Sequence, residues 1–433
     1  MFERYGLGCP PLALIETLYS KKWLHERLRF WKAFRPTLLA WPFRQFLWWK
    51  ESLLNWVEID ATALRHNLQG FRQAVGSRVA LGAVVKSNAY GHGMLETARI
   101  AVAAKAEWLC VNNLDEALAL RGAGHQEKIL IMGYVPLDGL EDVVRHGLRP
   151  VVYHLETVER LDTLGRQTDT RVPLHLKIET GTHRQGILER DVPAFADTIR
   201  NAKGVVLEGL STHFANIEDT TNHEYAERQI ETFDRVTEAF RQAGCPATMR
   251  HSACSAAALL FARTHLDLAR LGIAMYGLWP SRETYLSCIE RGRIEIDLRP
   301  VLTWKTRIAQ VKDVAEGALV GYGCTWKATR PSSIAVLPVG YAEGYDRGLS
   351  GVAHVLVRGR RAPIRGRICM NICLADVTDI PGASLEDEVV LLGSQGDETI
   401  TAEQLATWAG TISYEIVARI HPGLSRVVLE VEA

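Results

Sequence analysis

Short apolar runs recur along the chain from Val79 to about residue 296, with amphipathic stretches between them. Eight runs fit this description: ALGAVVK (80–86), WLCVN (108–112), KILIM (128–132), RPVVY (149–153), PLHLKI (173–178), VVLEGLST (205–212), TMRHS (248–252) and LDLARLG (266–272). Stretches such as 114–121, 155–164 and 225–243 separate them and carry apolar residues at helical spacing. Strand and helix signals in alternation predict a parallel sheet. Eight such units within about 220 residues predict a closed (β/α)8 barrel of the TIM type over residues 56–296.

A doubly wound open sheet is the alternative that the alternation leaves open. The best sequence mark of such a sheet is a GxGxxG turn after a strand. None of the eight runs is followed by one, so the barrel is the preferred fold class.

The pattern changes after about Asp297. The runs at 301–314, 332–339, 354–366 and 389–392 are strand-like, are separated by glycine and proline turns, and show little helical spacing. They predict a second, mostly antiparallel β domain over residues 297–433.

The first 55 residues form a third region of different composition. Residues 1–50 hold nine Lys and Arg against three Glu, and five of the eleven tryptophans. Pro10 and Pro11 precede an amphipathic stretch over residues 12–34, and Pro36 ends it, so a helical arm is predicted there. Three interpretations stay open: a helix packed on the core, a basic interfacial helix that touches a membrane, or upstream sequence from a mis-set start. We assign the arm no catalytic role.

Composition excludes several classes of function. The 433-residue chain balances 50 Lys and Arg against 50 Asp and Glu, so no overall charge attracts nucleic acid or a membrane surface. No apolar run reaches 18 residues, which a membrane-spanning helix needs. The eight cysteines form no CxxC pair, so no metal site is predicted, and we interpret them as reduced thiols of a cytoplasmic protein.

The side chains that offer chemistry stand where the apolar runs end. They are Lys86 at the first run, Arg184 after the fifth, His213 after the sixth, Ser255 after the seventh, and Arg270, Gly272 and Ile273 at the eighth. A barrel carries its active site on the loops after its strands, and it commonly holds phosphate after strands seven and eight. This placement nominates Ser255, Gly272 and Ile273 as phosphate ligands. A lysine at a strand end can form a Schiff base with a carbonyl cofactor, which nominates Lys86.

Several segments in order, from about Trp56 to the C-terminus, resemble the alanine racemases, a family that uses pyridoxal 5′-phosphate (PLP). They are AVVKSNAYGHG (83–93), LHLKIETGTHRQGI (174–187), EGLSTHFA (208–215), HSACSAAAL (251–259), ARLGIAMYGL (269–278), VGYGCTW (320–326), PVGYAEGY (338–345), RGRICMNICLADV (365–377) and TISYEIVARI (411–420). The resemblance implies the barrel followed by the β domain. It also implies that WVEID (56–60) is a strand that crosses to pack with the C-terminal domain.

The resemblance implies how the proton moves. Lys86 would carry PLP and act as one base, and Tyr322 from the other subunit of a homodimer would act as the second. His213 would link Tyr322 to Arg270, which would face the pyridine nitrogen of PLP. Two fixed bases on opposite faces of a planar intermediate avoid the movement that a single base would need. Because arginine is a donor that keeps its proton, Arg270 favours racemisation over decarboxylation or transamination.

The resemblance also implies which residues bind cofactor and substrate. The phosphate-binding positions match Tyr90, Ser255, Gly272, Ile273 and Tyr414. Arg184 would bind the phenolic oxygen of PLP and the substrate carboxylate. Lys177 would support Arg184, and in some relatives the matching lysine is carbamylated. Met370, reaching over from the other subunit, and Tyr341 would contact the substrate at the mouth of the site.

The implied function is the interconversion of L- and D-alanine through a PLP external aldimine, which supplies D-alanine for bacterial peptidoglycan. Cys254 and Asn371 stand where relatives often have Asn and Asp. They motivate an alternative, a broader racemase that also takes serine or lysine. A PLP carrier without catalysis would lack the β domain that provides Tyr322, and a decarboxylase would be expected to place an acid where Arg270 stands.

Overall fold

The structure, a computed structural model of the chain, describes residues 53–292 and 296–430. The N-terminal arm up to residue 52, with the helix predicted over residues 12–34, lies outside the described residues. Within the described part, no helix is both long and apolar enough to cross a membrane.

Eight parallel strands form the predicted barrel. They are β2 (Ala80–Val84), β3 (Trp108–Val111), β4 (Lys128–Ile131), β5 (Arg149–Val152), β6 (Val172–Lys177), β7 (Val205–Ser211), β8 (Met249–His251) and β9 (Leu268–Leu271). Each coincides with one of the eight apolar runs, and the hydrogen-bonded order is β8-β7-β6-β5-β4-β3-β2-β9. Between β8 and β9, the backbone N–H of Asp267 donates to the Arg250 carbonyl at 3.0 Å. The N–H of Arg270 donates to the Ala253 carbonyl at 3.1 Å. The barrel is confirmed, and the open-sheet alternative is wrong.

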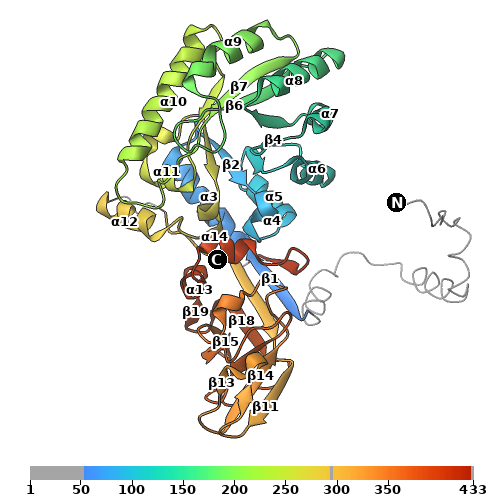
Figure 1. The fold of residues 1–433 in the computed structure, drawn as a ribbon, viewed down its shortest axis with the longest axis vertical. Coiled ribbons are helices and arrows are strands. Elements are labelled where there is room, and N and C mark those ends of the chain that lie inside the picture. Colours follow the sequence, from blue (N-terminus) through green and yellow to red (C-terminus); the bar gives the residue numbers. More distant parts are fainter. Residues whose placement is uncertain (1–52, 293–295, 431–433) are drawn as a thin grey trace, which may run out of the picture. The chain divides into compact units, whose positions relative to one another are not determined.

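Helices surround the barrel strands (Figure 1). They are α3 (Ala61–Val75), α4 (Lys86–Tyr90), α5 (Met94–Ala103), α6 (Leu114–Gly122), α7 (Leu140–Arg145), α8 (Leu155–Gln167), α9 (Val192–Asn201), α10 (Glu224–Gln242), α11 (Ser255–Leu260) and α12 (Arg282–Glu290). The longest, α10, buries Ile230, Phe233 and Phe240, which lie on one face at helical spacing. Single turns of 3-10 helix join these elements: η2 (Leu137–Gly139), η3 (Glu189–Asp191), η4 (Ala262–Thr264) and η5 (Ile273–Tyr276).

The second region is rich in antiparallel strands, as predicted. Its strands are β10 (Leu302–Arg307), β11 (Gln310–Val314), β12 (Leu319–Val320), β13 (Trp326–Lys327), β14 (Ser332–Leu337), β15 (His354–Val357), β16 (Arg360–Pro363), β17 (Cys373–Asp376), β18 (Glu388–Gln395), β19 (Glu398–Ile400) and β20 (Ser425–Leu429). The 3-10 turns η6 (Tyr322–Cys324) and η7 (Arg347–Leu349) lie among them. The largest sheet has the order β16-β15-β18-β10-β1-β20, and a core aromatic pair, Trp304 and Tyr345, packs edge to face beneath it.

The strand β1 (Asn55–Asp60) joins the two regions. It precedes the barrel in the chain, yet it pairs antiparallel with β10 and parallel with β20 in the C-terminal sheet. Four consecutive buried residues, Trp56 to Ile59, suit its place between two neighbouring strands rather than at an edge of that sheet. Residues 56–60 thus pair with strands of the C-terminal region although they precede the barrel in the sequence.

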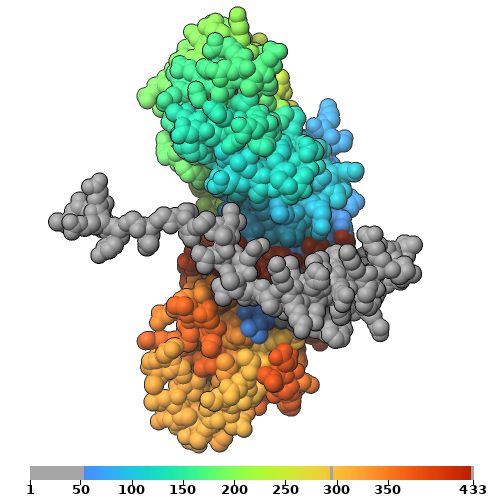
Figure 2. All heavy atoms as spheres, turned by 90° about the vertical axis from the view of Figure 1, so that its right-hand side faces the viewer, coloured from blue at the N-terminus to red at the C-terminus, as the bar shows by residue number. Residues whose placement is uncertain are grey.

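Two C-terminal helices, α13 (Ala402–Ala409) and α14 (Ser413–Ala418), interrupt the β region. Thr401 begins α13 through a capping box with Gln404. The helix α14 packs against α4 of the barrel so closely that a Cβ on Gly91 would lie 1.9 Å from the Val417 carbonyl oxygen. Figure 2 shows this C-terminal segment, in dark red, between the surfaces of the barrel and of the β strands. The contact brings Tyr414 to the barrel mouth.

Candidate active site

A cavity of about 580 Å³ opens at the C-terminal ends of the barrel strands. Ten of the thirteen predicted site residues line it: Lys86, Tyr90, Lys177, Arg184, His213, Ser255, Arg270, Gly272, Ile273 and Tyr414. They come from the ends of several strands and, for Tyr414, from α14. The barrel thus gathers side chains that lie up to 328 positions apart, from Lys86 to Tyr414.

Lys86 stands two residues after β2 and opens a left-handed turn. The next four residues, 87–90, all have φ between 53° and 54°, a conformation that costs L-residues roughly 1–2 kcal/mol each. A carboxylate holds this turn in place: Glu116 accepts the N–H of Ser87 at 2.6 Å and the N–H of Asn112 at 2.7 Å. Asn88 adds a third contact by accepting the N–H of Met94 at 2.9 Å. The strained turn is therefore over-determined by its surroundings, as expected at a functional site.

The electrostatics around Lys86 favour a neutral amine. Burial lowers its pKa, the nearby Arg184 guanidinium lowers it further, and Glu116 opposes the change. A neutral amine is the form that can attack a carbonyl or accept a proton.

A second group of residues forms what we call the phosphate cradle: Tyr90, Ser255, Gly272, Ile273 and Tyr414. Ser255 Oγ accepts the N–H of Gly272 at 3.0 Å and lies 3.4 Å from the N of Ala274. A Cβ on Gly272 would stand 2.8 Å from Tyr90 Oη, so any side chain there would force the Tyr90 hydroxyl to move. Burial raises the pKa of both Tyr90 and Tyr414, which keeps their hydroxyls protonated. Neutral hydroxyls and backbone N–H groups suit a bound dianion.

Cationic side chains also line the cavity. Lys177 is half-buried, and desolvation together with Arg270 and Arg184 holds its pKa well below the usual range. Burial also lowers the pKa of Arg270. Glu179 acts on Lys177 and partly opposes the lowering of its pKa. None of the ion pairs within residues 53–292 and 296–430 involves Arg184 or Arg270, so their guanidiniums leave positive charge in the cavity, which favours an anionic ligand.

Arg270 is held by four hydrogen bonds. Its Nη1 donates to His251 Nδ1 at 2.5 Å and to the His251 carbonyl at 2.9 Å. Its Nη2 donates to the carbonyls of Thr212, at 2.8 Å, and Ser252, at 3.1 Å. These bonds use all four Nη hydrogens, so within the described chain only the Nε–H of Arg270 is left for a ligand.

His213 lines the same cavity but is not one of the acceptors of Arg270. Its pKa is held well below the usual value by burial and then by Lys177 and Arg270. Its carbonyl accepts the Thr182 hydroxyl at 2.7 Å, which fixes the backbone and leaves the imidazole toward the cavity. The predicted link from Arg270 through His213 to Tyr322 stays a prediction.

Three predicted residues lie outside the cavity. Tyr322, Tyr341 and Met370 are in the β region, and their exposed fractions are 74 %, 44 % and 57 %. A tyrosine and a methionine exposed to this extent are candidates for contact with another molecule.

Five polar residues that line the cavity were not predicted from the sequence: Asn112, Gln185, Ser211, Glu218 and His251. His251 ends β8 within a segment already singled out, so its position at a strand end was the available signal. Glu218 lies five residues after His213, and its Oε2 is 3.5 Å from Tyr414 Oη. Burial raises the pKa of Glu218, and Asp219 adds to the effect. Gln185 donates to Tyr153 Oη at 3.1 Å, and nothing in its run of sequence signalled this.

Comparison with known proteins agrees with this architecture. The family model "Alanine racemase, N-terminal domain" matches residues 59–280, and "Alanine racemase, C-terminal domain" matches residues 301–428. An alanine racemase of Syntrophobacter fumaroxidans is 43 % identical over 368 residues, covering 84 % of this chain and 95 % of its own length. One from Halothermothrix orenii is 40 % identical over 372 residues, covering 86 % of this chain and 96 % of its own length.

Solved structures agree as well. The alanine racemase of Bacillus anthracis with bound L-Ala-P has a TM-score of 0.81 at 34 % identity, covering 87 % of this chain and 95 % of that one. The alanine racemase of Bartonella henselae with covalently bound pyridoxal phosphate has a TM-score of 0.75 at 26 % identity, covering 87 % of this chain and 99 % of that one. On the fold, on the cavity and on these matches, the chain belongs to the alanine racemase family.

Proposed function

We propose that the chain racemises alanine with PLP, and that Lys86 and the Tyr322 of a second subunit move the proton. As a member of the alanine racemase family, the chain is a racemase; the proposal concerns its substrate, its cofactor and its residues. One observation carries it: a single cavity holds a lysine of lowered pKa, a cradle of neutral donors and uncompensated cations.

The donor chemistry of the cavity fits PLP. The phosphate of PLP needs several hydrogen-bond donors, which the phosphate cradle offers without bringing a negative charge. Its phenolic oxygen is an anion that Arg184 can pair with, and the Nε–H of Arg270 is a single donor suited to a ring nitrogen. When bound, PLP supplies an electron sink that weakens the Cα–H bond of the amino acid.

The protein groups then have distinct tasks. Lys86 Nζ, whose pKa burial and Arg184 lower, can in its neutral form accept the α-proton on one face of the substrate and return it there. Tyr322 would give and take the proton on the other face. Because Tyr322 is exposed and lies outside its own cavity, a homodimer in which it reaches the partner's cavity accounts for both facts.

Lys177 is proposed to be carbamylated. Addition of an amine to CO2 requires the unprotonated amine, and the lowered pKa of Lys177 provides it. The new N–C bond replaces the amine by a carbamate anion, with loss of one proton. That anion would lie among Arg184, Arg270 and His213 and would offset their charge.

Alanine is the proposed substrate, rather than serine or lysine, because the relatives from Halothermothrix orenii and Syntrophobacter fumaroxidans, at 40 % and 43 % identity, are alanine racemases. Asn371, which motivated the broader alternative, donates its Nδ2 to Glu343 Oε1 at 2.7 Å, so a carboxylate remains beside this position. Tyr341 and Met370, both exposed, are proposed to narrow the mouth of the partner's site.

The proposed location is the cytoplasm, where D-alanine would serve peptidoglycan synthesis. Support comes from the seven cysteines in the described part of the chain, all of which are free thiols.

A racemisation assay tests the proposed function. Loss of optical rotation, followed by circular dichroism with L-alanine, L-serine and L-lysine in parallel, should be fastest with alanine. Lys86→Ala should abolish both this activity and the visible absorbance of PLP bound to the protein, because the variant lacks the amine proposed to bind the cofactor. Faster turnover of serine or lysine would overturn the alanine assignment, and an unchanged spectrum in the variant would overturn the role of Lys86.

A further inference from the structure

We propose that Glu208, inside the barrel and on the far side of Arg270 from the cavity, is a positioning residue that sets the direction of the Arg270 hydrogen bonds through His175 and His251. The inference rests on the proposed function, because Arg270 is taken to meet the cofactor. None of these three residues was among the predicted site residues.

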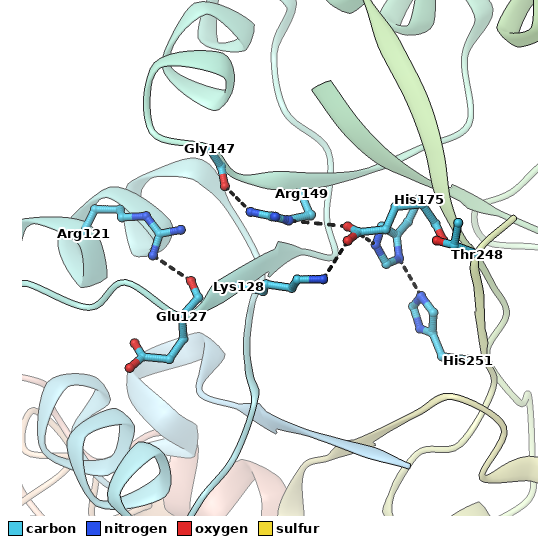
Figure 3. Close-up of polar contacts among 9 residues, drawn as sticks. Arg121, Glu127, Lys128, Gly147, Arg149, His175, Thr248 and His251 are labelled. Atoms are coloured by element: carbon cyan, nitrogen blue, oxygen red, sulfur yellow. Dashed lines mark hydrogen bonds and ion pairs between the residues drawn. The ribbon is translucent and has the colours of Figure 1, made fainter. Parts of the chain in front are cut away.

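The connection is a continuous chain of hydrogen bonds. Glu208 Oε2 lies 3.2 Å from His175 Nε2, and His175 Nδ1 lies 2.8 Å from His251 Nε2. His251 Nδ1 then receives the Nη1 hydrogen of Arg270 at 2.5 Å. Figure 3 shows His175 with His251 on one side and the side chains of Lys128 and Arg149 approaching from the other.

The two ends of this chain determine the tautomers in the middle. Arginine can only donate, so His251 Nδ1 must be the acceptor, and the proton of a neutral His251 is on Nε2. That N–H donates to His175, whose own proton is therefore also on Nε2 and points at Glu208. An ionised carboxylate can only accept, which agrees with this direction. Each link is thus specified by its neighbours.

The chain works only if both histidines are neutral. A second proton on His251 would have to occupy Nδ1, where it would face the hydrogen of Arg270. Burial lowers the pKa of His175, and burial followed by Arg270 lowers the pKa of His251. Glu208 alone would favour a charged His175, but two cations share its carboxylate. Lys128 Nζ is 2.9 Å from Oε1 and Arg149 Nε is 3.4 Å from Oε2.

Glu208 is ionised at neutral pH in spite of its burial. Burial works to raise its pKa, but hydrogen bonds from His175 and Lys128 outweigh burial and lower the pKa to about 2. Lys128 and Arg149 therefore offset the negative charge of the Glu208 carboxylate. Both histidines can then stay neutral, and Glu208 determines only which of their nitrogens carries the proton.

Packing prevents His175 from turning away. A Cβ on Gly209 would lie 2.3 Å from His175 Nδ1, so the glycine next to Glu208 makes room for the ring. Trp108 meets the ring edge to face at 5.5 Å, and Lys128 Nζ lies 4.8 Å above the Trp108 ring. The imidazole is fully buried in this slot. Its orientation is fixed, and only its proton position remains to be set by Glu208.

The consequence reaches the cavity. With its four Nη hydrogens bound, Arg270 keeps one plane and leaves only its Nε–H toward the cavity. Without an acceptor at position 208, His175 and His251 can shift their protons to Nδ1, and His251 would then oppose Arg270. The guanidinium would lose one of its four fixing bonds.

Three variants test the chain of hydrogen bonds from Glu208 to Arg270. Glu208→Leu removes the acceptor, whereas Glu208→Gln keeps an amide oxygen that can accept from His175 and should restore function. Glu107→Leu is the control, because Glu107, like Glu208, pairs with a cation, Arg72 at 2.6 Å, and it accepts the N–H of Leu81 at 2.7 Å, but it does not lead to Arg270. Thermal unfolding of each variant without PLP shows whether it is folded.

In folded protein we expect Glu208→Leu to shift the absorption maximum of bound PLP and to lower kcat for L-alanine on the order of tenfold, with KM nearly unchanged. Glu208→Gln and Glu107→Leu should keep the wild-type spectrum. A folded Glu208→Leu protein with wild-type spectrum and kcat would overturn the proposal. If wild-type protein neither binds PLP nor racemises alanine, the proposed function fails instead.

Neutron diffraction on wild-type crystals in D2O shows the tautomers of His175 and His251 directly. This test does not depend on whether the variants fold. Deuterium should be found on Nε2 of both His175 and His251, with their Nδ1 atoms bare. Deuterium on Nδ1 of His251 would overturn the proposal even if the enzyme is active.

Discussion

At the scale of single residues, the close approach at Gly272 predicts a selective loss of cofactor binding. Gly272→Ala would place a methyl group 2.8 Å from Tyr90 Oη, so the hydroxyl must move out of the phosphate cradle. We expect the dissociation constant for PLP to rise on the order of tenfold, the equivalent of about one charge-assisted hydrogen bond. Equilibrium titration of the PLP-free protein by fluorescence measures this.

Gly122→Ala is the matched control for that substitution. Gly122 ends α6, and a Cβ there would meet nothing within 4 Å. PLP binding should be unchanged, and the helix should gain up to about 1 kcal/mol of stability. Equal PLP affinities in the two alanine variants would contradict the assigned role of Gly272.

The lowered pKa of Lys86 predicts the pH dependence of Schiff-base formation. Only the neutral amine reacts, so the rate rises with pH, and its midpoint should lie below the ordinary lysine pKa of about 10.4. Arg184→Gln removes a cation that disfavours protonated Lys86, so in that variant the pKa and the midpoint should move up.

Stopped-flow absorbance after mixing PLP-free protein with PLP gives the rate at each pH. Arg190→Gln, an exposed arginine in the same loop, is the control and should leave the midpoint in place. A downward shift in Arg184→Gln would contradict the electrostatic argument.

At the scale of elements, the turn after β2 depends on α6, a helix that follows it in the chain only after α5 and β3. Glu116, in the first turn of α6, accepts backbone N–H groups from Ser87 and Asn112 with its two oxygens. Glu116→Gln would direct an amide N–H at one of these donors, and we expect a loss of about 1–3 kcal/mol in the free energy of unfolding, with weaker PLP binding. Urea unfolding and PLP titration measure the two effects.

The neighbouring Asp115→Asn is the control, since Asp115 is exposed and only favours the start of the helix. It should cost no more than a few tenths of a kcal/mol. A similar loss in both variants would mean that Glu116 acts only through the helix dipole.

The sequence predicts an element well when residues within that element stabilise it, and poorly when contacts with distant residues do. The eight barrel strands are evident from their apolar runs, because burial on both faces of a parallel strand leaves few polar residues. The left-handed turn at 87–90 is not evident, because Glu116 and Asn88 stabilise it by contacts that no local propensity reveals. The helix α14 is short and marginal alone, and its packing on α4 is what gives Tyr414 a place in the cavity.

The site shows the same division. Residues at strand ends, such as Lys86 and Arg270, can be nominated from the barrel pattern, and the family resemblance adds Tyr414. Glu208 could not be nominated in this way, because it lies in the middle of β7. Its proposed role depends on contacts with His175 and, through it, His251, which only the three-dimensional structure reveals.

At the scale of the whole molecule, the exposure of Tyr322 predicts that each complete site draws on two subunits. Neither Lys86→Ala nor Tyr322→Phe homodimers should be fully active, because every site in them lacks one base. In a heterodimer of the two variants, both substitutions would fall in one site, and the other site would combine a native Lys86 with a native Tyr322.

Heterodimers are obtained by co-expressing the two variants with different tags and purifying on both. They should show about half the kcat per dimer of the wild type, since one of two equivalent sites is intact. If Tyr322 served its own subunit, one site would lack Lys86 and the other Tyr322, and the heterodimer would be as impaired as the homodimers. Light scattering on the same samples checks that they are dimers. Recovery of activity therefore distinguishes a site shared between subunits from a site within one subunit. Because Tyr322 is exposed and lies outside the cavity of its own chain, we expect the shared site.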